Sequence, residues 1–62
     1  MQVKQQLKGI KVGAEFEGFG GFAGRTIKLI DRNLNGFAVF EPCGLSDKVF
    51  LSLSSDRQLV RS

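Results

Sequence analysis

Residues 26–42 of this chain read TIKLIDRNLNGFAVFEP, and this stretch decides the fold. The pair Asn35-Gly36 stands between two apolar runs, and such a pair is a strong signal for a β-hairpin because both residue types tolerate a positive φ. We expect one strand over residues 26–30 and a second over residues 37–41, joined by a polar turn. The proline that follows is expected to end the second strand, because it has no backbone N–H to donate to a sheet.

The chain before this hairpin predicts a further strand and a glycine-rich loop. Apolar and polar residues alternate over residues 10–17, which is typical of a strand with one buried face. The residues expected on that buried face are Ile10, Val12, Ala14 and Phe16. Four glycines within residues 18–24 break any helix and weaken any strand, so this segment is expected to be a mobile or tightly turned loop. Residues 1–9 are mostly polar and predict a flexible arm or a short helix.

The chain after the hairpin repeats the two-residue alternation. Residues 48–54 predict a strand in which Phe50 points away from the core. The side chains expected to point toward the core are Val49, Leu51 and Leu53. A short turn or one turn of 3₁₀ helix is expected over residues 54–57, before a short last strand over residues 58–61.

Five short strands without a long helix predict an all-β fold in one small domain. An open sheet of this size exposes two edges, and closure into a barrel reduces that exposure. The succession of a long loop, a hairpin turn, a second loop and a tight turn before a short last strand resembles the SH3-like barrel. We therefore expect a single five-stranded SH3-like β-barrel over residues 10–62, preceded by an arm or short helix over residues 1–9.

The composition favours a binding module over an enzyme. The 62 residues include no histidine, so His-based catalytic triads and His-containing metal sites are excluded. The single cysteine, Cys43, excludes an internal disulfide and a cysteine-based zinc site. No apolar run reaches the roughly 18 residues of a membrane span, and the start of the chain lacks the apolar stretch of a signal peptide. We expect a cytoplasmic protein with no catalytic residue, metal, cofactor, membrane contact or small-molecule substrate.

Residues 20–26 read GGFAGRT and follow the strand predicted to end at residue 17. This arrangement resembles the KOW motif of ribosomal and transcription-elongation proteins, in which a strand runs into a Gly-Pro-Phe-x-Gly turn, an alternating strand, a turn with acidic residues and asparagine, and another strand. The resemblance covers residues 13–41, and Gly21 and Ile27 stand where proline and a second glycine are usual. It implies an SH3-like barrel that contacts RNA, DNA or a protein of the gene-expression machinery. The order of an N-terminal helix and five strands is also similar to the Sm-like family.

The charge balance indicates an attraction to polyanions. Nine lysines and arginines stand against six aspartates and glutamates, which gives a net charge of +3 and a pI near 9.5. A pI above about 9 is one recognised feature of nucleic-acid-binding domains, although such a charge also suits solubility. Lys4, Lys8 and Lys11 precede the first acidic residue, and Arg57 and Arg61 lie near the other end. If the ends lie together, as chain termini often do, these five cations share one region.

The sequence predicts a nucleic-acid site made of cations and phenylalanines. Aromatic rings stack on unpaired bases while cations hold phosphates, and phosphate contacts position a protein without reading much sequence. The candidate phosphate ligands are Lys11, Arg25, Lys28 and Lys48. The candidate stacking residues are Phe19, Phe22 and Phe50.

Two alternatives from other functional classes stay open. Exposed phenylalanines can anchor a contact with another protein, which predicts an adaptor or a small inhibitor that docks on a larger protein such as a nucleic-acid enzyme. The same side chains can drive assembly into a homo-oligomer, because a small core with surplus exposed phenylalanine gains by burying it.

The register of the strand at residues 48–54 predicts that stability and binding separate at neighbouring positions. Phe50→Ala is expected to leave the Tm nearly unchanged, since surface substitutions usually cost less than about 0.5 kcal/mol, and to weaken partner binding at least about tenfold. Leu51→Ala is expected to lower the free energy of unfolding by about 2–5 kcal/mol through the cavity it leaves. Thermal melts and a binding titration check both variants. The opposite pattern would show that the register is one residue out.

Overall fold

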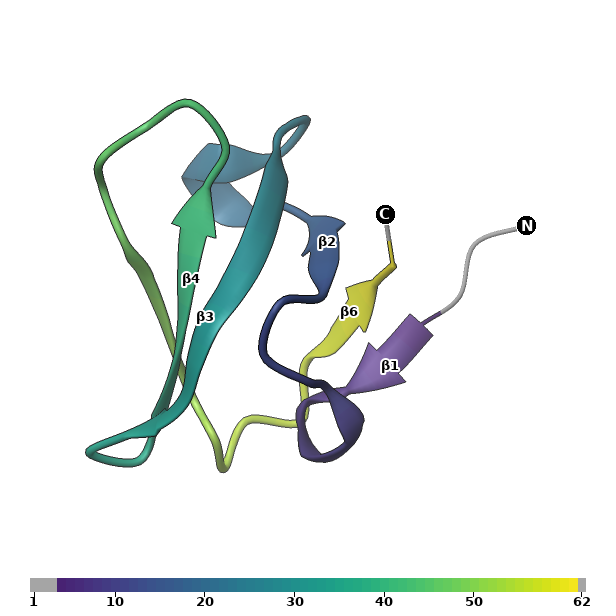
Figure 1. Ribbon diagram of the computed structural model, residues 1–62. Helices are drawn as coiled ribbons and strands as arrows, with labels where there is room; N and C mark the ends of the chain where they lie inside the picture. The colour runs from purple at the N-terminus through teal and green to yellow at the C-terminus, as the bar shows by residue number, and fades with distance from the viewer. Residues whose placement is uncertain (1–3, 62) are drawn as a thin grey trace.

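The computed structural model describes residues 4–61, which form six strands and two single turns of 3₁₀ helix (Figure 1). In chain order these elements are β1 (Lys4–Gln6), η1 (Leu7–Gly9), β2 (Glu15–Glu17), η2 (Gly20–Phe22), β3 (Thr26–Leu34), β4 (Phe37–Pro42), β5 (Val49–Ser52) and β6 (Gln58–Val60). The predicted all-β class is confirmed.

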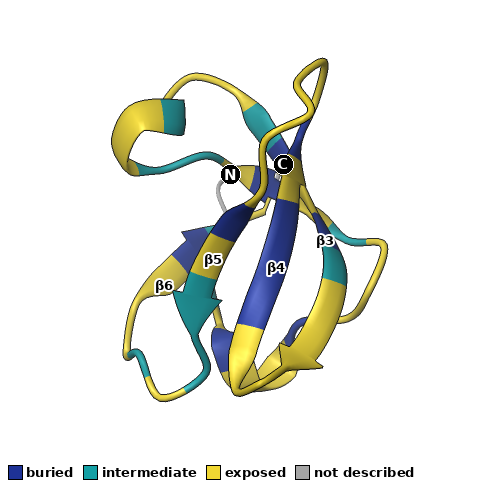
Figure 2. Cartoon of the chain, turned by 90° about the vertical axis from the view of Figure 1, so that its left-hand side faces the viewer, coloured by how far each residue is buried: buried dark blue, intermediate teal, exposed yellow. Residues whose placement is uncertain are grey.

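The hairpin of β3 and β4 is the largest element of the fold. Asn35 and Gly36 form its turn with φ angles of 55° and 84°, as the sequence predicted. The strand β3 continues to Leu34, beyond the predicted end at residue 30, because two register shifts let its polar second half keep pairing with β4. Such shifts leave extra residues unpaired and bend the strand. Figure 2 shows that burial is greatest in the middle of β4 and falls toward the turn.

The strands belong to two sheets and not to one closed barrel. A four-stranded antiparallel sheet has the order β2-β3-β4-β5, and β1 pairs with β6 in a separate two-stranded sheet. An isolated bridge between Phe16 and Arg61 links the two sheets. Figure 1 shows β2 beside β6. Within the described part of the chain, β5 pairs only with β4, so its outer edge carries no strand. The predicted closure over five strands is therefore not observed.

Residues 4–9, for which the sequence suggested an arm or a short helix, contribute directly to the core. Lys4–Gln6 pairs with β6, and Leu7 in η1 is buried in the same cluster as Leu59 of β6. The two ends of the described chain therefore lie side by side (Figure 1).

Aromatic rings occupy the centre of the core. Phe16 and Phe40 are fully buried and meet edge to face with ring centroids 6.3 Å apart. This confirms the predicted inward position of Phe16. Phe37 lies on the opposite face of β4 from Phe40 and is exposed. Ile27 and Leu29 are both fully buried, so they lie on the inner face of β3.

The predicted strand over residues 10–17 is wrong in its first half. Only residues 15–17 form a strand, and Val12 is 60% exposed although it was expected in the core. The N–H of Ala14 donates to the carbonyl of Lys11 at 3.1 Å, and Gly13 adopts a φ of +98°. These features close a turn over residues 11–14, and the turn rotates Val12 away from the face that buries Ile10 and Phe16.

The strand β5 has the predicted register but is shorter than predicted. Val49 is buried and Phe50 is 56% exposed, which confirms that Phe50 points outward. Leu51 and Leu53 are only partly buried, so the effect of Leu51→Ala should lie near the lower end of the predicted range, at about 2 kcal/mol. The turn that follows is closed by the N–H of Ser55 donating to the carbonyl of Ser52 at 3.0 Å, and no 3₁₀ helix forms there. The predicted last strand is confirmed as β6.

Gly18 has no room for a side chain, which allows a sharp test of the loop structure. An added Cβ would overlap the carbonyl oxygen of Phe22 and lie 3.0 Å from that of Arg25, whereas a Cβ on Gly21 meets nothing within 4 Å. Gly18→Ala should lower the free energy of unfolding by about 1–3 kcal/mol, which in a domain of this size lowers the Tm by roughly 4–8 °C for each kcal/mol. Gly21→Ala is the matched control and should leave the Tm unchanged or slightly raised. Equal Tm values for the two variants would contradict this packing.

Candidate functional site

Two of the predicted phosphate ligands lie in a row of alternating charge. We call the side of the four-stranded sheet that faces away from the core its outer face. Across this face, Glu15 pairs with Lys28 and Lys28 pairs with Glu41. The amine of Lys48 completes the row, 3.6 Å from the carboxylate of Glu41. The charged row, Glu15, Lys28, Glu41 and Lys48, has no net charge, so it offers little attraction to phosphates.

Phe50 lies beside this row on the outer face. It is the cross-strand partner of Val39, and its ring meets the ring of Phe37 edge to face with centroids 6.3 Å apart. Leu34 pairs with Phe37 from the neighbouring strand β3. Leu34, Phe37, Val39 and Phe50 form one apolar group, which we call the outer patch. The sequence predicted Phe50 as part of a site, but it did not predict these neighbours.

Phe19 and Phe22 belong to the glycine-rich loop and pack against the core. Both are partly buried, and the ring of Phe19 meets Phe40 edge to face at 6.3 Å. The guanidinium of Arg57 lies 4.6 Å from the centre of the Phe19 ring, in cation–π contact. One side of the Phe19 ring is therefore already occupied. Its availability for base stacking is less than the sequence suggested.

The predicted site residues occupy several separate parts of the molecule. Lys28, Lys48 and Phe50 lie on the outer face, whereas Lys11 is exposed in the turn at residues 11–14. Arg25 is exposed directly after the glycine-rich loop, where its carbonyl accepts a hydrogen bond of 2.7 Å from the N–H of Gly18. Phe50 thus lies on the same face as Lys28 and Lys48, whereas Phe19 and Phe22 pack against the core elsewhere.

A different set of cations comes together where the chain ends meet. Lys4 on β1 pairs with Val60 on β6, Arg61 directly follows β6 and Arg57 directly precedes it. Lys8 follows β1 in η1, and all four cations are exposed. Residues 1–14 and 57–62 contain no aspartate or glutamate. The expectation that the two ends lie together is confirmed by the pairing of β1 with β6, whereas Lys11 lies in the turn at residues 11–14. We call β1 and β6, with Lys8, Arg57 and Arg61, the basic ribbon.

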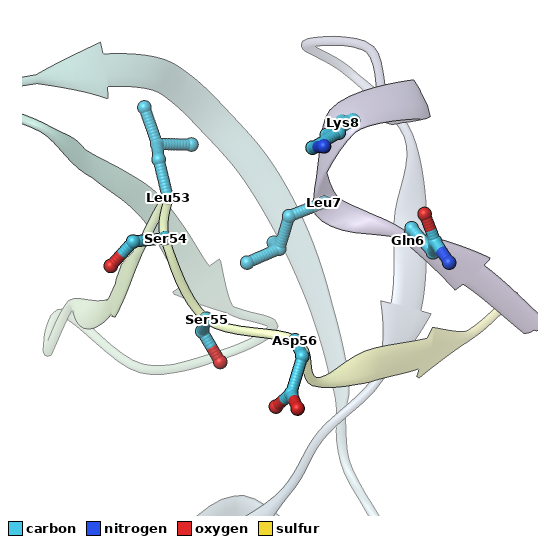
Figure 3. Close-up of a pocket in the computed structure, with 7 residues that line it drawn as sticks. All are labelled: Gln6, Leu7, Lys8, Leu53, Ser54, Ser55 and Asp56. Atoms are coloured by element: carbon cyan, nitrogen blue, oxygen red, sulfur yellow. The ribbon is translucent and has the colours of Figure 1, made fainter.

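A groove lies at one end of the basic ribbon. Leu7 and Leu53 form its apolar lining, and Figure 3 shows the two side chains on either side of this space, one from η1 and one from the turn after β5. The polar residues around it are Gln6, Lys8, Ser54, Ser55 and Asp56, and its volume is about 390 Å³. An adjoining hollow of about 330 Å³ adds Arg32 and Asn33.

Arg32 connects this groove to the end of the hairpin. Its guanidinium donates a hydrogen bond to the carbonyl of Lys8, so the far end of β3 is held against η1. Two cationic side chains therefore stand beside the apolar lining. The sequence contained no local signal for this groove, because its lining residues lie far apart along the chain.

The described residues offer no cluster of metal-binding side chains. Among residues 4–61, no three potential ligand side chains of histidine, cysteine, aspartate or glutamate gather as a metal site would require. The same residues include no helix with the length and apolar character needed to cross a membrane. Comparison with protein-family models, curated proteins and solved structures gives no match to this chain.

Proposed function

We propose that this protein is a small non-enzymatic module that binds nucleic acid through its basic ribbon. The observation that carries the proposal is the pairing of β1 with β6, which brings the segment of Lys4 and Lys8 against the segment of Arg57 and Arg61. Residues 1–14 and 57–62 contain no aspartate or glutamate. Clustered exposed cations bind phosphates mainly by releasing condensed counterions, which needs no fixed sequence. The function requires no cofactor.

The groove supports a single-stranded form of nucleic acid as the ligand. An unpaired base can lie against the partly exposed Leu53 while Lys8 and Arg32 contact the flanking phosphates. A duplex keeps its bases stacked inside and cannot use such a groove. Single-stranded RNA and single-stranded DNA both supply such bases and phosphates, so the groove fits both equally.

The resemblance to the KOW motif supports the same function, since that family contacts RNA, DNA or proteins of gene expression. The order of elements from the glycine-rich loop to β6 and the bridge between Phe16 and Arg61 support an SH3-like arrangement as the finer description of the fold. We propose a cytoplasmic location, where RNA and proteins of gene expression are available as partners.

A second candidate function is an adaptor that docks on another protein. The exposed rings of Phe37 and Phe50 support it, since aromatic anchors often dominate protein interfaces. Retention of a protein partner after nuclease treatment would favour the adaptor, and loss of all partners would favour nucleic acid.

Two matched double variants test the basic ribbon. Lys4→Gln/Arg61→Gln and Lys28→Gln/Lys48→Gln each remove two positive charges, but only the first pair lies on the ribbon. The affinity for short labelled single-stranded RNA and DNA should fall steeply with salt for the native chain, with a slope of log K against log salt near −0.7 for each phosphate contact. The ribbon variant should lose up to about 0.7 in slope for each contact removed, and the outer-face variant should keep the native slope. Fluorescence anisotropy over a salt series measures both.

Equal slopes for the two double variants would show that net charge alone matters and would contradict a ribbon site. Absence of binding at low salt would overturn the proposed function as a whole.

A further inference from the structure

The outer patch is a second, small apolar cluster on the far side of the sheet from the core. Val39 is only 4% exposed, yet it is not part of the core cluster, because its side chain lies on the outer face. The side chains around Val39 are exposed to solvent: Leu34 is 45% exposed, Phe37 is 42% exposed and Phe50 is 56% exposed. Exposed apolar residues grouped in this way mark interaction surfaces more often than isolated ones do.

The charged row beside this patch is complementary to itself when reversed. In the order of the strands β2, β3, β4 and β5, its charges are negative, positive, negative and positive. Read from the other edge of the sheet, the signs are opposite at every position. A rotation that lays β5 over β2 and β4 over β3 therefore places unlike charges opposite each other along the whole row.

We propose that the outer face binds a second copy of this chain, sheet against sheet, about a two-fold axis that runs parallel to the strands between β3 and β4. In this arrangement Glu15 faces Lys48 of the second copy and Lys28 faces its Glu41, and each contact occurs twice. A two-fold axis across the strands would instead lay the charged row of one copy over the outer patch of the other. That alternative would desolvate charges without partners, which is costly.

The same axis also matches the apolar residues. Phe37 and Leu34 are cross-strand partners on β4 and β3, so the rotation places Phe37 over Leu34 of the second copy. Phe50 on β5 comes over the turn at residues 11–14, which holds the exposed Val12. Hence Phe37 and Leu34 gain apolar neighbours, and Phe50 comes near Val12.

The dimer is expected to be weak and to leave the basic ribbon free. A standard interface buries about 800 Å² on each partner, and one sheet face of a molecule measuring 29 × 26 × 20 Å supplies less than that. Association should therefore depend on concentration. Leu59 of β6 packs in the core on the inner face of the sheet, so the ribbon points away from the proposed interface.

A charge exchange between Glu15 and Lys48 tests the proposed axis. Within one chain these residues lie on β2 and β5, separated by two intervening strands and by roughly 14 Å at the usual strand spacing, so they interact weakly. Sedimentation over a wide concentration range should show a monomer–dimer equilibrium for the native chain. Glu15→Lys should weaken dimerisation at least about tenfold, because two like-charge contacts replace two favourable ones. The double variant Glu15→Lys/Lys48→Glu should restore most of the native dimer affinity.

Two further variants complete the test. Asp56→Lys makes the same change in net charge as Glu15→Lys but lies in the turn before β6, so it should leave the dimer unchanged. Phe50→Ala should weaken the dimer at least about tenfold, and circular dichroism should show that every variant is folded. A native chain that stays monomeric at all concentrations would overturn the proposal and would leave the face to another protein or to solvent. A folded double variant that fails to regain the dimer would overturn the proposed axis.

Discussion

The edge-on packing of Phe40 against Phe16 and Phe19 is the interaction on which the rest of the structure depends. Side chains alternate along a strand, so a buried Phe40 obliges Val39 and Glu41 to lie on the opposite face of β4. Cross-strand pairing carries this choice to Lys28 on β3 and Phe50 on β5. One buried ring thus decides which charges and which apolar side chains meet solvent, and a shift of one residue in β4 would invert every assignment.

The sheet separates two surfaces of different chemistry. The inner face holds the core and, beyond it, the ribbon where the chain ends meet. The outer face holds the charged row and the outer patch. The net charge of +3 therefore does not describe either surface well: the row is neutral, whereas the chain segments that form the ribbon contain no aspartate or glutamate. Composition predicted an attraction to polyanions, but only the strand pairing shows which basic segments lie side by side.

Short sequence patterns correctly predicted the features that depend on the backbone preferences of neighbouring residues and on side-chain alternation along a strand. The turn at Asn35-Gly36 and the outward position of Phe50 follow from backbone preference and two-residue alternation, and both are confirmed. The same alternation failed at Val12, because a tertiary hydrogen bond from the N–H of Gly13 to the carbonyl of Leu29 helps hold a turn there. The strand β1 and the groove lined by Leu7 arise from contacts between distant segments. Neither has a signature within its own few residues.

The pairing of Lys4 with Val60 also affects the order in which the strand pairs form during folding. The β3–β4 hairpin closes a tight local loop, whereas the ribbon joins segments separated by nearly the whole described chain and must overcome a larger loop-closure entropy. The ribbon should therefore form last and open first in local unfolding. A polyanion that contacts both β1 and β6 would hold this seam closed, so ligand binding would protect the amides of the ribbon more than those of the hairpin. The surface that recognises the ligand would then be the part of the molecule that the ligand itself makes rigid.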